Sequence, residues 1–283
     1  MKLRIVSDLH VDINGDGNFG FRNKLDEVDA LLIAGDIAGD YKREEKFLNG
    51  LASQTDKHIY AIAGNHLGYE YKRDVYTYVS KMFDMSPTEV GTKQWSIDYL
   101  KNNLPENVHY MDNDYIDLGD YILFAGTMYS DYKLYPNQTL SIQASNAWLN
   151  DFRYVYIKDK VIRRITPYDY IKYHAKFKRK LNKCLKETTK DVIVMTHFCP
   201  SIKSISDKYL KGNDIYLNAS YASNMEKYIL KNPRIKYWIC GHVHNDNEYN
   251  IGNCKVIACP YGYHRNGEQK VQPRKWYGRI LEI

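Results

Sequence analysis

The sequence predicts an α/β protein whose functional residues follow the strands of a parallel sheet. Two observations predict this class. Short apolar runs alternate along the chain with helical patterns, and Gly, Asp or Asn residues bound most of the runs. The length of 283 residues suits one large domain or two small ones, and we treat residues 1–283 as a single domain.

The N-terminal part of the chain predicts three buried strands and one helix. The strands are Leu3–Val6, Ala30–Ala34 and His58–Ala63, and a helix over Arg43–Ser53 lies between the second and the third. The middle of the chain is less regular. Helices are expected over Val75–Phe83 and Gln94–Asn102, and a strand pair over Tyr115–Leu118 and Tyr121–Ala125 around a turn at Gly119-Asp120.

Regular order returns in the C-terminal half, after a polar and aromatic stretch over 127–164. A long basic helix is expected over Tyr168–Glu187, because Pro167 suits the first turn of a helix. The elements predicted beyond it are a strand Val192–Met195, a helix Ser220–Leu230, a strand Ile235–Ile239 and a hairpin of Glu248–Ile251 with Lys255–Ala258 over Gly252-Asn253.

The composition narrows the class of protein. Lys and Arg number 40 against 34 Asp and Glu, and the net charge of +6 suits a phosphorylated or nucleic-acid ligand without requiring one. No stretch approaches the roughly 20 apolar residues of a membrane helix, and the N-terminus does not resemble a signal peptide. The 5 cysteines form no CxxC pair, which predicts free thiols in a reducing compartment.

Polar residues directly follow five of the predicted strands. They are Asp8 and His10, Asp36, Asn65 and His66, His197, and His242 and His244. Strand ends in an α/β sheet lie side by side on one edge, so these side chains are expected to meet. Nitrogen and oxygen donors of this kind suit imidazole-preferring divalent metals. They suffice for two ions bridged by a carboxylate, the arrangement of two-metal phosphoester hydrolysis.

The ordered motifs resemble the calcineurin-like metallophosphoesterase superfamily over nearly the whole chain. The motifs are Asp8-x-His10, Gly35-Asp36, Gly64-Asn65-His66, His197 and Gly241-His242-x-His244. The resemblance implies a four-layer α/β/β/α sandwich with a dinuclear metal centre. By the same resemblance, Asp8, His10 and His244 bind one ion. Asn65, His197 and His242 bind the other, Asp36 bridges the two, and His66 stays unligated near the leaving-group oxygen.

A closer resemblance is to an uncharacterised bacterial and phage branch of this superfamily. It is carried by residues 126–131, 150–153, 196–201 and 260–263. Many relatives have an acidic residue directly after the Asn-His pair, whereas this chain has Leu67. A carboxylate that orients His66 is therefore either missing or supplied from elsewhere in the chain.

These residues predict a metal-dependent hydrolase that cleaves phosphodiesters or phosphomonoesters, with a small or nucleotide-like substrate. A hydroxide bridging the metals is expected to attack phosphorus, and His66 to assist the leaving group as the catalytic acid. The two divalent ions are Mn, Fe, Zn, Ni or Co, with Mn favoured. The alternatives are a metal-dependent nuclease acting on DNA or RNA, and a non-catalytic metal-bound scaffold.

Substrate contacts are expected outside the metal ligands. Residues 127–187 are the best candidate for a helical cap over the metal edge, and Arg153 within them suits bidentate phosphate binding. Tyr261, His264 and Arg265 follow the last hairpin and are candidates for the rim of the site. We expect a phosphoester or nucleotide partner, possible contact with nucleic acid, no membrane, and the cytoplasm of a bacterial or phage-infected cell.

Overall fold

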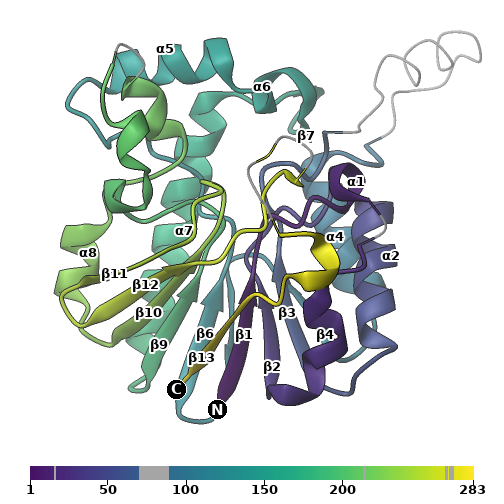
Figure 1. Cartoon of the computed structure of the whole chain (residues 1–283). Coiled ribbons are helices and arrows are strands. Elements are labelled where there is room, and N and C mark those ends of the chain that lie inside the picture. The colour runs from purple at the N-terminus through teal and green to yellow at the C-terminus, as the bar shows by residue number, and fades with distance from the viewer. Residues whose placement is uncertain (16, 70–88, 213–214, 265–266, 268–270) are drawn as a thin grey trace, which may run out of the picture.

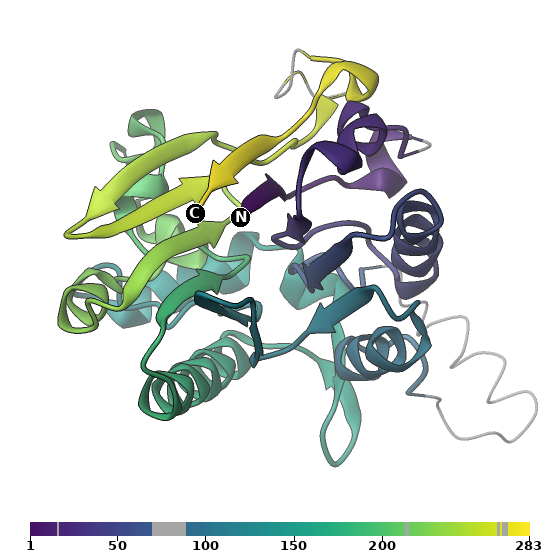
Figure 2. The same cartoon turned by 90° about the horizontal axis from the view of Figure 1, so that it is seen from below.

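Two sheets pack face to face between layers of helices in the computed structural model, which describes residues 1–15, 17–69, 89–212, 215–264, 267 and 271–283 (Figures 1 and 2). The first sheet has the order β13 (Arg279–Glu282), β1 (Lys2–Val6), β2 (Ala30–Ile33), β3 (His58–Ile62), β4 (Val108–Met111). The second has the order β11 (Asn247–Ile251), β12 (Cys254–Ala258), β10 (Ile235–Cys240), β9 (Asp191–Met195), β6 (Tyr121–Ala125), β5 (Asp114–Asp117).

The inner strands of both sheets run parallel, so their carboxyl ends share one edge of the molecule. The outer strands β13, β5 and β11 pair antiparallel with their neighbours. Figure 1 shows the strand ends pointing toward α5 (Gln138–Trp148) and α6 (Asp151–Tyr154), which lie over this edge. A small hairpin of β7 (Tyr156–Lys158) and β8 (Ile162–Arg164) follows α6.

The four layers follow from the alternation of side chains along each strand. In β2, Leu32 packs between the two sheets, whereas Leu31 and Ile33 face the helices. That helical layer consists of α2 (Tyr41–Ala52) and α4 (Lys93–Asn103). The sequence prediction of an α/β/β/α sandwich is confirmed by this arrangement.

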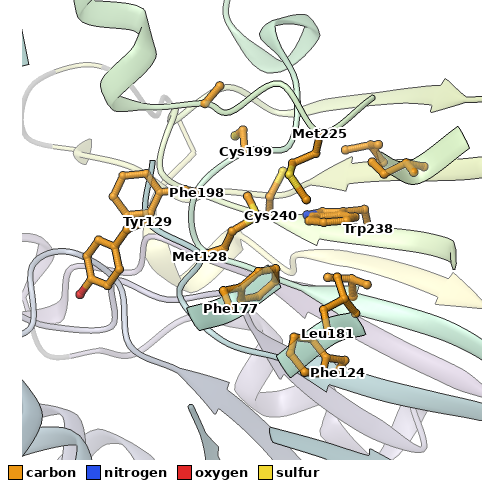
Figure 3. Packing of buried hydrophobic residues seen from close by; sticks show 14 of the residues in the cluster. Phe124, Met128, Tyr129, Phe177, Leu181, Phe198, Cys199, Met225, Trp238 and Cys240 are labelled. Atoms are coloured by element: carbon orange, nitrogen blue, oxygen red, sulfur yellow. The ribbon is translucent and has the colours of Figure 1, made fainter. Parts of the chain in front are cut away.

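The opposite helical layer consists of α7 (Pro167–Glu187) and α8 (Glu226–Lys231). Figure 3 shows Phe177 and Leu181 of α7 beside Phe124 and Trp238 of the second sheet. The Phe124 and Phe177 rings meet edge to face with centroids 5.3 Å apart. The last third of segment 127–187 is therefore a layer of the sandwich, which leaves α5 and α6 as the part that lies over the strand ends.

Most strands and helices predicted from the sequence are present within one or two residues. Both hairpin turns form as expected, with positive φ at Gly119 and Gly252. The helix expected over Val75–Phe83 lies outside the described residues. The prediction missed α5, β4 and β13, whose sequences are short or mixed in polarity.

The predicted helix over Ser220–Leu230 is wrong. A 3₁₀ helix spans Ile215–Ser220, and α8 begins only at Glu226. The residues between are extended because they pair with the loop after β9. Cys199 donates its N–H to Tyr221 O at 3.1 Å and accepts from the N–H of Ser223 at 3.0 Å. A tertiary backbone pairing thus overrides the helical pattern at this place.

None of the helices in the described part of the chain is long and apolar enough to cross a bilayer. The five cysteines are all buried free thiols. The expectation of free thiols therefore agrees with the structure.

A buried carboxyl group between α2, α4 and β4 gives a stability prediction. Tyr110 Oη donates to Glu44 Oε2 at 2.7 Å, and Glu44 Oε1 has no partner among the described residues. Burial raises the pKa of Glu44 to about 8 from 4.5. A raised folded-state pKa contributes stability below the unfolded pKa, and this contribution is lost as the pH rises through the folded pKa.

We therefore expect Glu44→Gln to stabilise the metal-free protein at alkaline pH. The two proteins should have similar unfolding free energies at pH 4.5, and at pH 8 the variant should be more stable by about 2 to 4 kcal/mol. Urea unfolding at several pH values between these limits measures the difference. A variant less stable than the wild type at pH 8 would show that Glu44 is ionised and stabilising there.

Candidate metal centre

All eight polar residues predicted at strand ends meet at the carboxyl edge of the sheets. Seven of the eight, all except Asn65, form three overlapping groups, and the ligand atoms of each group lie within 4.8 Å of one another. The groups are Asp8 with His10 and His244, Asp36 with His197 and His242, and Asp36 with His10 and His66. Segments up to 236 residues apart in the sequence thus build one cluster, from Asp8 to His244.

The first group brings two imidazoles and a carboxylate together. His10 Nε2 and His244 Nε2 lie 3.1 Å apart, and His244 Nε2 lies 3.4 Å from Asp8 Oδ1. Asp8 is held in place from both sides, because its carboxylate also accepts the His242 backbone N–H at 2.9 Å and the Ser7 hydroxyl at 2.5 Å. Three donor atoms therefore converge on a point beside Asp8.

The second group is oriented by a backbone carbonyl directly after β2. His197 Nδ1 donates to Ala34 O at 2.9 Å, which leaves Nε2 as the atom that faces the cluster. His197 Nε2 lies 3.3 Å from Asp36 Oδ2 and 2.9 Å from Asn65 Oδ1. His242 Nε2 is buried and finds no hydrogen-bond partner in the described residues, which suits a ligand atom.

Asp36 lies where the groups overlap. Its Oδ2 is 3.3 Å from His197 Nε2, 3.8 Å from His10 Nε2 and 3.9 Å from His66 Nε2. Its Oδ1 accepts the backbone N–H of His66 at 2.9 Å. This carboxylate is therefore the group that can contact ions on both sides.

The strand-end loops carry unusual backbone conformations. Among the described non-glycine residues, eight have a positive φ, and five of these eight are Asp8, His10, Asp36, His242 and His244. Each such residue costs about 1 to 3 kcal/mol, so the surrounding structure must hold it there. Strain concentrated at five predicted ligands supports a functional role for these loops.

Two glycines in these loops leave room for the ligands. A Cβ atom on Gly241 would lie 2.6 Å from Asp8 Oδ2. A Cβ atom on Gly64 would overlap the Asp36 carboxylate outright. The glycines of the Gly-Asn-His and Gly-His-x-His motifs are therefore required by the close approach of a carboxylate from another strand.

The protonation states fit divalent cations. Burial alone would raise the pKa of Asp8, but its hydrogen bond to His244 and the charge of that group lower it to about 2. Burial also opposes ionisation of Asp36, yet His197 and His66 hold its pKa well below the usual range. Burial lowers the pKa of His10 to about 3. Ionised carboxylates beside a neutral imidazole are the forms that bind metal.

His197 differs from the other imidazoles of the cluster. Burial alone would lower its pKa, but Asp36 and Asp8 raise it to about 9. A positive charge at this place is therefore favourable in the protein itself. The buried carboxylates of Asp8 and Asp36 therefore favour a cation beside them, and the mixed nitrogen and oxygen donors of the cluster suit a divalent metal ion.

His66 lies beside the ligands and faces the cavity above them. Its Nε2 lies 3.1 Å from Tyr263 Oη, and its ring stacks on Tyr69 with centroids 4.1 Å apart and an interplanar angle of 17°. Leu67, which stands where many relatives have an acid, is buried in the core against the first helical layer. Tyrosines thus hold His66 in this protein.

The predicted substrate residues are placed differently from the ligands. Arg153 is exposed, and its Nη2 donates to Ala147 O at 2.8 Å. Tyr261 is buried against Phe19 and its hydroxyl donates to Val271 O at 2.9 Å. His264 is half-buried and its N–H donates to Asn14 Oδ1 at 3.0 Å. Arg265 lies outside the described residues.

A cavity of about 780 Å³ opens above the cluster, and the described residues that line it include neither Arg153, Tyr261 nor His264. Its floor is formed by predicted ligands and His66. Its walls come from the end of α5 and the start of α6 on one side, and from the segment before α8 on the other. Aromatic, acidic and basic side chains of these walls include Tyr69, Trp148, Asp151, Lys208, Tyr209, Lys211 and Tyr263.

Sequence reasoning missed Asp151, although it lies in the 150–153 segment that carried the resemblance. That reasoning selected Arg153 for its charge, whereas the structure brings Asp151 to Asn65 at 2.8 Å. An acidic residue next to the apolar Phe152 was the available signal, because charges in such positions are buried only when partnered.

Comparisons with known proteins agree with this geometry. The profile of the calcineurin-like phosphoesterase family matches residues 1–246. Among solved structures, the chain is similar to phosphopantetheinyl hydrolase from Mycobacterium tuberculosis, with a TM-score of 0.64 and 14% identity over 96% of this chain and 94% of that one. A dimetal phosphatase from Danio rerio aligns with a TM-score of 0.47 and 12% identity over 93% and 88% of the two chains.

No sequence among curated proteins matches the chain. The likeness to the phosphopantetheinyl hydrolase, at 14% identity, shows the fold alone. The family profile covers most of the sequence, including every predicted metal ligand and His66. The chain therefore belongs to the calcineurin-like phosphoesterase family.

Proposed function

We propose that this protein hydrolyses phosphoester bonds with two divalent metal ions bound at the strand-end cluster. The observation that carries the proposal is the presence of two His/Asp groups, one around Asp8 and one around Asp36, joined by a third in which Asp36 meets His10. Asp8, His10 and His244 would hold one ion, and Asn65, His197 and His242 the other. Asp36 would contact both, since its Oδ2 faces His10 and His197.

When bound, two such ions lower the pKa of a water molecule and neutralise the oxygens of a phosphoryl group. The protein supplies the geometry. Ala34 and Ser7 fix the orientation of His197 and Asp8, and the buried strand ends exclude bulk water around the carboxylates. Mn²⁺ is our first choice among the ions, because mixed nitrogen and oxygen donors accept it and its availability often decides occupancy.

We assign the role of general acid to His66. It faces the cavity, it lies 3.9 Å from Asp36 Oδ2, and Tyr263 Oη sits 3.1 Å from its Nε2. From this place its ring can give a proton or a hydrogen bond to the oxygen of the departing alcohol. The side chain of Tyr263 keeps Nε2 aimed at the cavity.

The walls of the cavity favour a nucleotide-like substrate. Trp148 is 68% exposed and Tyr209 is 56% exposed, although both line the cavity. Exposed aromatic side chains at a site can stack on the planar ring of a ligand. Lys208 and Lys211 lie on the same wall as Tyr209, and their positive charges suit a further anionic group of the substrate. A phosphoester that carries a base fits this lining.

The test compares substrates with Mn²⁺ restored to the metal-stripped protein. Bis(p-nitrophenyl) phosphate and p-nitrophenyl phosphate separate diester from monoester cleavage, and the p-nitrophenyl ester of thymidine 5′-phosphate adds a base. We expect Trp148→Ala to raise KM for the thymidine ester by about tenfold, since stacking contributes about 1 to 3 kcal/mol per base. Tyr168→Ala, on the exposed face of α7, is the matched control.

Equal KM values for the Trp148→Ala variant and the wild type would remove the base from the proposed substrate class. Absence of turnover with every ester at full metal occupancy would contradict the hydrolase itself. The protein would then be a metal-bound scaffold without catalytic activity.

A metal-dependent nuclease is the second candidate, and a basic groove favours it. A groove of about 690 Å³ runs along α7, lined among others by Lys133, Lys178, Arg179, Lys183 and Lys186. A row of cations of this kind suits a nucleic-acid backbone. A single-stranded oligonucleotide offered as the substrate distinguishes this candidate from the first. Cleavage by a nuclease that binds nucleic acid through this groove should fall steeply as the salt concentration rises.

The compartment that we propose is the cytoplasm of a bacterial or phage-infected cell. The five buried thiols suit a reducing compartment.

A further inference from the structure

We infer that Asp151 is a positioning residue that fixes both a metal ligand and the general acid. It acts on Asn65 directly and on His66 through Tyr69. The inference rests on the proposed function, because it takes Asn65 as a ligand and His66 as the acid. It supplies from α6 a carboxylate beside Asn65 and Tyr69, where the residue after the Asn-His pair is the apolar Leu67.

Asp151 lies at the first position of α6 and is fully buried. Its Oδ1 accepts a hydrogen bond from Asn65 Nδ2 at 2.8 Å and a second, short one from the Tyr69 hydroxyl. Tyr69 Oη also lies 3.4 Å from Asn65 Nδ2. Two donors from the loop after β3 therefore share a single carboxylate oxygen of α6.

This contact decides which end of the Asn65 amide faces the metal cluster. A carboxylate oxygen only accepts, so the amide nitrogen must point toward Asp151. The amide oxygen then points toward the cluster, where it lies 2.9 Å from His197 Nε2. With no acceptor at position 151, the amide could turn its nitrogen inward, and a nitrogen that carries two protons cannot bind a cation.

The second action of Asp151 passes through Tyr69. The ring of Tyr69 lies nearly parallel to the His66 ring, with centroids 4.1 Å apart. The hydroxyl bound to Asp151 anchors the far end of this ring. Stacking on Tyr69 thus sets the plane of the His66 imidazole. Asp151 Oδ1 holds the Tyr69 hydroxyl, and the same oxygen orients Asn65.

The incomplete hydrogen bonding of Asp151 separates a positioning role from a structural one. Its Oδ2 is buried without a hydrogen-bond partner, and no cation in the described residues forms an ion pair with it. A buried carboxylate whose second oxygen lacks a partner contributes less to stability than one that is fully hydrogen-bonded. A residue retained for stability would be satisfied, whereas one retained to orient a ligand need not be.

The experiment titrates the metal-stripped full-length protein with Mn²⁺ and follows binding calorimetrically. Asp151→Leu removes the acceptor, Asp151→Asn keeps an oxygen but removes the charge, and Asp159→Asn is an exposed control in the same segment. For Asp151→Leu we expect the second Mn²⁺ to bind about 10 to 100 times more weakly and the first to bind as in the wild type. For Asp151→Asn we expect most of the affinity to remain.

Two further readouts complete the test. The melting temperature of metal-free Asp151→Asn should equal or exceed that of the wild type. Tyr69→Phe keeps the stack but loses its anchor, so kcat should fall more for alkyl esters than for p-nitrophenyl esters, whose leaving group needs little acid assistance. Metal binding by Tyr69→Phe should stay close to the wild-type value.

The inference is overturned if Asp151→Leu binds both ions with wild-type affinity. It is also overturned if metal-free Asp151→Asn melts well below the wild type, which would make Asp151 a structural residue. If Asp151→Leu does not fold, Asp151→Ala also removes the acceptor, and the same weakening of the second Mn²⁺ is expected for it. A wild-type protein that binds two ions yet cleaves no phosphoester would instead contradict the proposed function and leave the role toward Asn65 open to measurement.

Discussion

Replacing Asp36 with Asn is expected to abolish turnover and metal binding together. Asp36 lies between the two ligand groups, with Oδ2 within 4 Å of three histidine nitrogens. An amide offers one neutral oxygen where the carboxylate offers two charged ones, so neither ion keeps its full set of ligands. Loss of several kcal/mol of electrostatic stabilisation corresponds to a fall in kcat/KM of roughly 10³-fold or more.

Metal content by elemental analysis and phosphoester hydrolysis, measured on the same preparation, test this expectation. Asp26→Asn is the matched control, because Asp26 is exposed and lies in the 3₁₀ helix Gly20–Glu27, outside the strand-end loops. If Asp36→Asn retained two ions with full affinity and lost only activity, Asp36 would act as a base and would not bridge the metals.

Replacing His66 with Ala should lower the rate of hydrolysis while both metal ions stay bound, unlike the Asp36 variant, which should lose both. A positioned acid contributes about 10²- to 10⁴-fold, so kcat for an alkyl phosphoester should fall within that range. The loss should be smaller for a p-nitrophenyl ester, whose leaving group is already stable as an anion. His58→Ala, an exposed histidine at the start of β3, serves as the control.

This prediction also separates two roles that the geometry offers to His66. Its Nε2 lies close enough to His10 and Asp36 to form a third potential ligand group. If His66→Ala lost an ion along with its activity, His66 would be a ligand and the acid would have to be found among other residues of the cavity. Tyr263, 3.1 Å from His66, would then be the first candidate.

The strand-end cluster could be predicted from the sequence because its signal is local. Each ligand follows an apolar run within a few residues, and parallel strands bring such positions to one edge whatever the details of packing. The same logic predicted a parallel α/β sheet, whereas the second sheet of the sandwich was implied by the family resemblance alone. It gave no information on distances, and the left-handed conformations of Asp8 and Asp36 have no local sequence signature beyond the neighbouring glycines.

The substrate wall could not be predicted in this way, since its contacts join segments with no shared pattern. Asp151 and Asn65 are 86 residues apart, and only folding brings them together. Arg153 and Tyr261 were plausible by residue type, but one binds a backbone carbonyl on the surface and the other packs in the core. Polarity predicts the chemistry of a side chain and leaves open where the side chain points.

The most direct test of the central claim counts bound ions and turnover in one titration. Metal-stripped protein receives increasing Mn²⁺, and ions bound per chain and hydrolysis of bis(p-nitrophenyl) and p-nitrophenyl phosphate are followed in the same samples. Our account predicts that two ions bind and that turnover rises as the second one binds. Full turnover with one ion, or two bound ions with no hydrolysis of either ester, would contradict it.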